Sequence, residues 1–168
     1  MARTRSAAAR NPSGVLGDAL LLKRLAAELG FTPLPAGREA LSALVPRLPA
    51  RFPPLYELLV ISYRWTETPL GPVSLLANPP GPDLTGLADE IFRDPALTAA
   101  LHTAGHLQLG RANGGASDPI CFDTTRQRAD RDAPIVRINR DEILRTGGLQ
   151  VVEEIAPSFR QLVNEFLG

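Results

Sequence analysis

The stretch GRANGGASDPICFDT, residues 110–124, combines a glycine-rich bend, an aspartate before a proline and the only cysteine of the chain. It is either a catalytic loop that carries a nucleophile or a turn that leads into a buried strand. Its glycines can supply the positive backbone angles of a wide hairpin. Asp118, held extended before Pro119, can accept hydrogen bonds from loop amides. We therefore interpret the stretch as a turn followed by a strand.

The enzymatic alternative uses Cys121 with His102 or His106, as a nucleophile with its base or as part of a metal site. The two histidines are four residues apart in HTAGH, a spacing that can place both on one helix face. However, Gly105 tends to end a helix, and the glutamate of a zincin motif is missing. Cys121 lies between apolar neighbours, as a buried thiol does. We expect no enzyme, no cofactor and no metal, and a small hydrolase or metal-dependent enzyme stays the alternative.

Composition is that of one ordinary folded domain. The chain has 168 residues, of which 44% are hydrophobic and 21% charged, and its formal net charge is zero. A balanced charge offers no long-range attraction to phosphate backbones, so we expect no nucleic-acid partner. A single cysteine forms no internal disulfide, and no apolar run approaches the roughly 20 residues that cross a bilayer. The expected location is cytoplasmic, with no membrane partner.

The first twelve residues, MARTRSAAARNP, carry three arginines and no acid. No continuous apolar segment follows them, so the pattern of a secretory signal is not met. We expect residues 1–12 to form a flexible basic tail and residues 13–168 to form the domain.

Helical periodicity and capping residues predict a series of helices. One begins at Asp18 and stops at Gly30, a short one covers residues 40–44, and Pro53 and Pro54 open a third. Two more begin near Asp83 or Thr85 and at Asp94, the second ending at Gly105. The last begins after Ser158, and its Phe159, Leu162, Val163 and Phe166 fall on one inward face.

After residue 105 the period changes from helical to alternating. Short runs of alternating residues predict strands at 73–76, 106–110, 119–123, 134–139 and 149–154. Turn-rich segments between them suit antiparallel neighbours. The predicted fold class is α+β, a single domain with a mainly antiparallel sheet of about four to six strands and helices packed against it.

Five stretches together resemble the SUKH superfamily: FPPLYELLVISYRW, GPVSLL, GRANGGASDPICFD, APIVRINRDEIL and EIAPSFRQLVNEFL. The resemblance spans roughly residues 30–167 and rests on the order of the elements. The positions that match the family pattern are Pro54, Tyr56, Gly110, Asp118, Asp123, Pro157, Ser158 and Phe159. One departure follows the proline-aromatic helix, where many relatives turn on glycine or asparagine and this chain has Tyr63, Arg64 and Trp65.

The superfamily includes fungal cell-wall-synthesis regulators and bacterial toxin-immunity proteins. The resemblance therefore implies a SUKH-like domain over residues 13–168 that binds a protein and catalyses nothing. Its partner would be a toxin domain that it neutralises, or it would act as a regulatory scaffold.

We predict a partner surface at Arg64, Trp65 and Asp118. Tryptophan and arginine often dominate the energetics of interfaces. The proline-rich loop 77–83 and the glycine loop 110–118 flank strands of the predicted sheet, and they would converge with these residues on one rim. Trp65 can equally be a core residue, and that alternative stays open.

Overall fold

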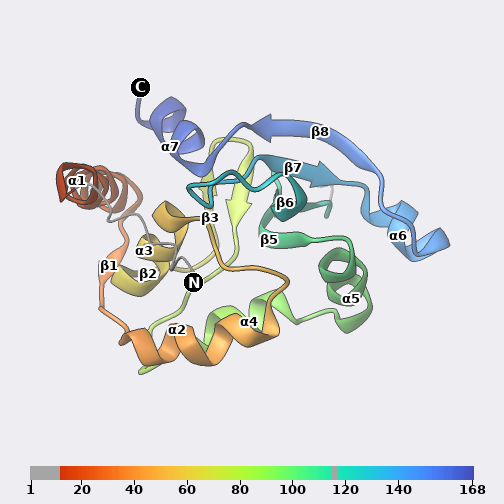
Figure 1. Cartoon of the computed structure of the whole chain (residues 1–168), viewed down its shortest axis with the longest axis horizontal. Helices are drawn as coiled ribbons and strands as arrows, with labels where there is room; N and C mark the ends of the chain where they lie inside the picture. The colour runs from red at the N-terminus through yellow and green to blue at the C-terminus, as the bar shows by residue number, and fades with distance from the viewer. Residues whose placement is uncertain (1–11, 115–116) are drawn as a thin grey trace, which may run out of the picture.

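An antiparallel sheet of six strands forms the centre of this α+β domain (Figure 1). The computed structural model describes residues 12–114 and 117–168. Within these residues, the sheet has the order β3-β4-β5-β6-β7-β8, so neighbours in the sequence are neighbours in space. Its strands are β3 (Thr68–Leu70), β4 (Val73–Leu75), β5 (His106–Ala112), β6 (Pro119–Asp123), β7 (Ile135–Ile138) and β8 (Val151–Ala156). A separate pair joins β1 (Thr32–Pro33) to β2 (Tyr63–Arg64).

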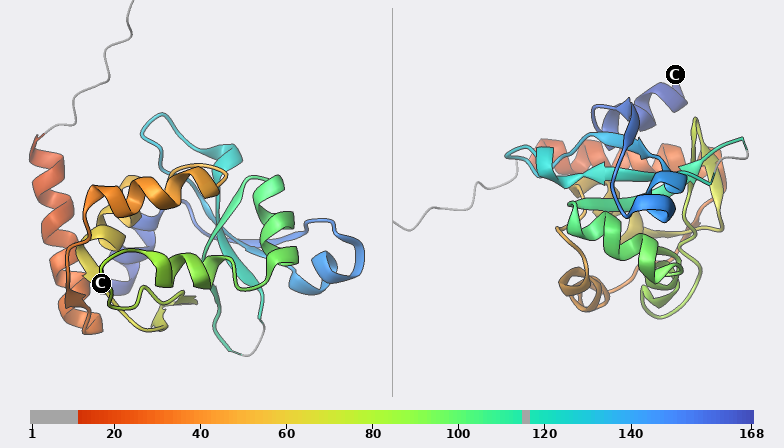
Figure 2. Two further views of the ribbon diagram at one scale, coloured as in Figure 1. Left: turned by 90° about the horizontal axis from the view of Figure 1, so that it is seen from below. Right: turned by 90° about the vertical axis from the view of Figure 1, so that its right-hand side faces the viewer.

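Helices lie on both sides of this sheet. They are α1 (Pro12–Leu29), α2 (Arg38–Leu44), α3 (Pro54–Ser62), α4 (Thr85–Ile91), α5 (Pro95–Thr103), α6 (Arg140–Thr146) and α7 (Phe159–Leu167), with 3₁₀ turns at Val45–Arg47 and Thr124–Arg126. Figure 2 shows α4 and α5 on one side of the sheet and α7 on the opposite side. The arrangement confirms the predicted α+β class, since helices and antiparallel strands are segregated.

Strand β6 separates two apolar clusters. All five of its residues are buried, as expected for a strand covered on both faces. Because side chains alternate along a strand, Ile120 and Phe122 join the main core with α3 and α7, whereas Cys121 joins a smaller cluster under α5 and α6. The predicted strand 119–123 is thus confirmed, and the other predicted strands are present with ends shifted by up to two residues.

Aromatic rings hold α7 against the centre of the main core. Tyr56 of α3 lies edge-on to Phe52, Phe122 and Phe159, with ring centroids 5.1, 5.3 and 5.3 Å apart. All four rings are fully buried. Edge-on contacts at these distances are the favoured geometry of aromatic pairs, so this cluster joins α3, β6 and α7.

Side-chain caps start several helices where the sequence predicted them. Asp94 and Ser158 each accept a hydrogen bond from the amide three residues later, and Gly30 ends α1 with a φ of +71°. The predicted start at Asp18 is wrong. The helix begins at Pro12, and Asp18 lies inside it, where it pairs with Arg160 of α7.

The predicted flexible tail falls mostly outside the described residues. Only Pro12 of that segment is described, and it is the first residue of α1 rather than part of a tail.

Helix α6 was not predicted, although its sequence carries a start signal. Asn139 accepts a hydrogen bond from the Glu142 amide at 3.1 Å, and Gly147 ends the helix with a φ of +74°. This is the pattern of an N-cap followed by a left-handed C-terminal glycine. The short length of α6 leaves little periodicity to detect, so the cap was its main signal.

Gly110 serves a different purpose from the one predicted. Gly114 has a φ of +90° and supplies the expected turn. Gly110 instead lies within β5, beside an irregularity in the pairing with β6. A Cβ atom there would come within 2.5 Å of the Ser74 carbonyl oxygen, so close packing of β4 on β5 requires glycine. Gly115 lies outside the described residues.

The aromatic cluster generates a stability prediction. Phe159→Ala should lower the free energy of unfolding by about 3–5 kcal/mol, because it empties a fully buried site. Phe166 was predicted to lie equally deep but is only half-buried, so Phe166→Ala should cost clearly less. Urea denaturation of both variants measures this order. Equal losses, or none for Phe159→Ala, would contradict the docking of α7.

Candidate functional site

Arg64 is buried, contrary to its predicted place on a partner surface. Its side chain and backbone expose only 1% of their surface. The guanidinium donates to the Asn78 side-chain oxygen at 3.2 Å and to the carbonyl oxygens of Asp83 at 3.0 Å, Leu34 at 3.3 Å and Gly81 at 3.4 Å. A buried charge is tolerated where its donors are all directed at oxygens. Burial lowers the pKa of Arg64, an effect that nearby Asp83 opposes.

Trp65 is buried as well, with 4% exposed. Its indole Nε1 donates to the Leu76 carbonyl at 2.9 Å, and its ring stacks on Phe31 with centroids 4.8 Å apart. Tryptophan in the core finds a partner for its N–H in this way. The assignment of Arg64 and Trp65 to a docking surface is therefore corrected, because neither side chain reaches the surface of the domain.

Asn78 completes this buried cluster and was missed in the sequence. It is fully buried, and its side-chain nitrogen donates to the carbonyls of Val60 at 3.0 Å and Tyr63 at 2.9 Å. Its backbone pairs with Trp65 in both directions. Asn78 thereby satisfies carbonyls at the end of α3, where helical partners run out. The only sequence signal was an asparagine before two prolines.

Asp118 ties three elements together next to helix α6. One carboxylate oxygen accepts from Arg137 Nε of β7 at 2.8 Å, and the other accepts from the Arg140 amide at 3.0 Å. Its side chain is 15% exposed. The predicted bond to a backbone amide is present, although the amide belongs to α6 and not to the glycine loop. Asp118 therefore fixes where α6 leaves the sheet.

The predicted rim does not assemble as proposed. Loop 77–83 is bound to Arg64, as described above. The start of the glycine loop is bound elsewhere, because the backbone and side chain of Asn113 donate to Pro72 and Gly71 in the turn between β3 and β4. In the described residues, no hydrogen bond or ion pair joins Asp118 to Arg64 or Trp65.

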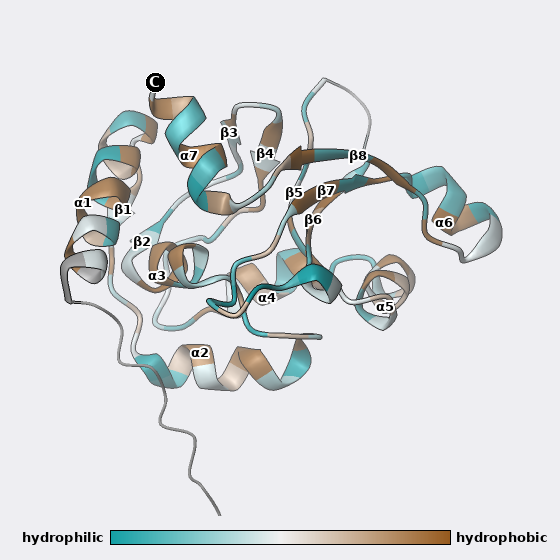
Figure 3. Ribbon diagram, turned by 45° about the horizontal axis from the view of Figure 1, so that its top comes forward, coloured by the Kyte–Doolittle hydropathy of each residue, from teal (hydrophilic) through white to brown (hydrophobic). Residues whose placement is uncertain are grey.

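A more exposed candidate surface lies on α6 and β8, which we call the α6–β8 arm (residues 140–156). Leu144, Val151 and Val152 are 56%, 49% and 46% exposed. Strand β8 is the last in the sheet, and no described strand pairs with its outer edge. Figure 3 shows hydrophobic colouring where β8 approaches α6. Exposed apolar side chains beside a free strand edge are typical of a protein-binding surface.

Acidic residues of β8 pair with Arg137 of β7 and with Arg126 of the 3₁₀ turn after β6. Glu153 pairs with Arg137 at 3.4 Å, and Glu154 pairs with Arg126 at 3.1 Å. Both acids are largely exposed, so each pair contributes little to stability. Charged side chains on an edge strand discourage unselective pairing between sheets.

Cys121 has the surroundings of a core residue. It is fully buried, and desolvation together with Asp123 raises the pKa of its thiol. A nucleophilic cysteine needs the opposite shift. Its partner across the strand pair is Gln108, while the two histidines lie at the end of α5 and the start of β5.

The histidines do not form the predicted alternative metal pair. Gly105 has a φ of +77° and separates them, so His102 ends in the helix and His106 opens the strand. His102 packs edge-on against Phe92 at 5.4 Å, and burial lowers its pKa. The Nε2 atom of His106 lies 3.9 Å from a carboxylate oxygen of Asp123. Burial lowers the pKa of His106 and Asp123 opposes that shift. Among the described residues, no three His, Cys, Asp or Glu side chains gather as metal ligands.

The fold and this surface define a class of protein: a single α+β domain with an antiparallel sheet and an exposed, partly apolar arm. No described helix is long and apolar enough to cross a membrane. A scan against models of protein families gives no match for the chain, and a search among curated proteins gives none either.

Burial of Cys121 generates the first test of this site. In the native protein the thiol should react with a maleimide at least about a thousandfold more slowly than in urea, since reaction requires opening of the core. A Cys121→Ser, Ser117→Cys double variant serves as control, because position 117 is exposed and should react fast. Fast labelling of native Cys121 would restore the nucleophile hypothesis.

The buried polar cluster of Arg64, Trp65 and Asn78 generates the second test. Asn78→Ala should destabilise the protein by about 2–4 kcal/mol, because the carbonyls of Val60 and Tyr63 and the Arg64 guanidinium all lose a partner. Asn113→Ala is the matched control, since Asn113 is exposed and should cost less than about 1 kcal/mol. Similar midpoints for the two variants in urea denaturation would show that the cluster is dispensable.

Proposed function

We propose that this chain is a non-catalytic, cytoplasmic domain that binds a protein, and that its partner is a toxin domain which it neutralises. A regulatory scaffold is the close variant of the same function. The observation that carries the proposal is the α6–β8 arm, where Leu144, Val151 and Val152 are exposed beside an unpaired strand edge. The resemblance of the sequence to the SUKH superfamily supports the same class.

The arm fits a protein better than a small molecule. An edge strand offers a row of backbone donors and acceptors to an incoming strand, and flanking apolar side chains give the contact its selectivity. The first four residues of β8 are all exposed, and the pairing with β7 is irregular at Val152, which lies between the paired residues Val151 and Glu153. A partner strand at this edge would therefore bury the apolar surface of Val151 and Val152.

The surroundings of the residues that the alternative uses support the non-catalytic proposal. Cys121, the one thiol, is fully buried and has a raised pKa, and His102 packs against Phe92. The alternative needs that thiol deprotonated and within reach of a substrate. The arm, in contrast, presents the groups that protein binding needs.

Exposed leucines on opposite sides of the molecule allow a matched test. Leu144→Lys should weaken binding to the toxin partner, to be sought among the products of the neighbouring genes, by about tenfold or more, because it places a charge in an apolar contact. Leu20→Lys on α1 changes an equally exposed leucine, 60% against 56%, and should leave affinity unchanged. Calorimetry with purified proteins measures both, and growth during co-expression reports neutralisation.

The two variants separate the surface from the function. If Leu20→Lys loses binding and Leu144→Lys does not, the binding surface lies on α1 and not on the arm. If the unaltered protein neither binds the neighbouring gene product nor protects cells from it, the proposed immunity function is wrong.

A further inference from the structure

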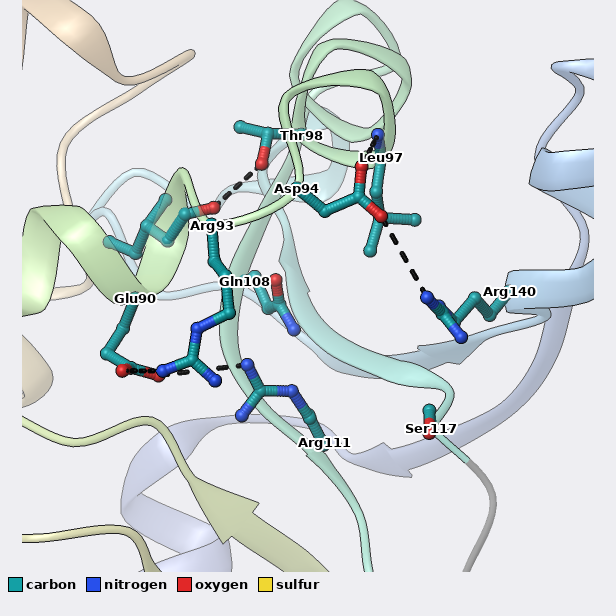
Figure 4. A pocket seen from close by; sticks show the side chains of 10 residues that line it. Glu90, Arg93, Asp94, Leu97, Thr98, Gln108, Arg111, Ser117 and Arg140 are labelled. Atoms are coloured by element: carbon teal, nitrogen blue, oxygen red, sulfur yellow. Dashed lines mark hydrogen bonds and ion pairs between the residues drawn. The ribbon is translucent and has the colours of Figure 1, made fainter.

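A polar pocket of about 190 Å³ lies between the α4–α5 junction, strand β5 and the start of α6 (Figure 4). Arginines at its wall outnumber acids, three to two: Arg93, Arg111 and Arg140 against Glu90 and Asp94. These five side chains carry one excess positive charge, which is balanced by Glu67, 3.6 Å from Arg111.

The guanidinium groups of Arg111 and Arg140 are poorly satisfied inside the protein. Guanidinium nitrogens of Arg111 lie 3.6 Å from a carboxylate oxygen of Glu67 and 3.7 Å from one of Glu90. A guanidinium nitrogen of Arg140 lies 3.9 Å from a carboxylate oxygen of Asp94. Charged hydrogen bonds between nitrogen and oxygen measure about 2.7–2.9 Å. Within the described residues, neither guanidinium makes a hydrogen bond, so donors of both are available to a ligand. Arg93 differs, because it donates to Glu90.

The backbones that carry these two arginines are fixed in place. Arg111 sits in β5 between Ser74 of β4 and Pro119 of β6. The Arg140 amide donates to Asp118, at the point where α6 begins. Asp118 is thus a positioning residue for this pocket. A rigid wall with free donors loses little entropy when a ligand binds.

A buried amide lies at the floor of the pocket. Gln108 of β5 is 6% exposed, and its nitrogen donates to the Gly110 carbonyl at 3.0 Å. Figure 4 shows its side chain between Arg93 and Arg111 on one side and Arg140 on the other. The lining is therefore polar at its base as well as at its rim.

Size and charge select the ligand. Pockets for whole small-molecule ligands measure about 300–1,000 Å³, so this one accommodates only a head group. The unused donors of Arg111 and Arg140 suit the two oxygens of a carboxylate. Glu90 and Asp94 line the same space, so they repel a doubly charged phosphate more strongly than a singly charged carboxylate.

The pocket adjoins the arm. Arg140 and Leu144 are four residues apart on α6, so their side chains lie on the same face of the helix. A partner that covers Leu144 therefore reaches the pocket at its border.

We propose that this pocket receives the carboxylate of an aspartate or glutamate side chain presented by the protein partner. The inference rests on the proposed function and names the chemistry of the partner: an apolar contact with an acidic residue beside it. Arg111 and Arg140 donate to the carboxylate, and Asp118 holds Arg140 in place.

The pocket itself is tested without the partner. Acetyl-glutamate amide is titrated into the isotope-labelled protein, with the neutral acetyl-glutamine amide and inorganic phosphate as parallel probes. We expect saturable shifts of the Arg111, Arg140 and Gln108 resonances, with a dissociation constant on the order of millimolar, for the glutamate probe alone. Arg111→Gln and Arg140→Gln should abolish saturation.

Arg145→Gln is the matched control, because Arg145 pairs with Glu142 at the far end of α6 and does not line the pocket. It makes the same change of charge and should leave the titration unaltered. Equal responses to the two amides, tighter binding of phosphate, or saturation that survives Arg140→Gln would each overturn the proposal.

A binding experiment with the partner separates this inference from the proposed function. Arg140→Gln should weaken binding to the partner about tenfold, with Arg145→Gln as control. If the partner binds the Arg140→Gln variant as tightly as the unaltered protein, the pocket inference is wrong while the protein-binding function stands. If the pocket binds the glutamate probe and no partner binds the unaltered protein, the proposed function fails instead.

Discussion

The buried contact between Arg64 and Asn78 is the constraint on which the helical half of the domain depends. The Asn78 carboxamide donates to carbonyls at the end of α3. The Arg64 guanidinium donates to Asn78, to the carbonyl that follows β1 and to two carbonyls of the loop that leads to α4. Loops rich in proline have few amides with which to satisfy themselves, so side chains must do it for them. A buried charge is costly unless every donor is used, and here that cost fixes a single arrangement of the loop.

Strand β6 imposes a second constraint, on the sheet. Its residues alternate between two apolar clusters, and a shift of one residue in the register would exchange Cys121 and Phe122. The larger ring would then enter the smaller cluster under α5. Gly110 restrains the neighbouring pairing of β5 with β4, because only a residue without Cβ fits against the Ser74 carbonyl oxygen. The stretch around the only cysteine is therefore the structural centre of the sheet.

Sequence alone predicted the elements better than the surfaces. Alternation and caps located the strands and most helices, because both signals are local. The burial of Arg64 could not be read locally, since its acceptors are carbonyls from residues 17 to 30 positions away in the chain. Arginine and tryptophan are frequent at interfaces when they are exposed. The prediction of a partner surface from Arg64 and Trp65 was wrong because both side chains are buried in the domain. Asp118 was noticed for the right reason, as an acceptor of a backbone amide, but its partner lay in a helix that was not predicted.

The same reasoning explains why we propose the arm as the recognition surface. Arg64, Trp65 and Asn78 are buried and hold loops in place, so a partner does not reach them. Strand β8 lies at the far end of the sheet order from β3, helix α6 precedes it in the chain, and their Leu144, Val151 and Val152 keep about half of their surface exposed. Surfaces that the fold does not need are free to vary in sequence, whereas the buried polar cluster is not. Under the proposed function, a domain built in this way changes partners through α6 and β8 while its core stays the same.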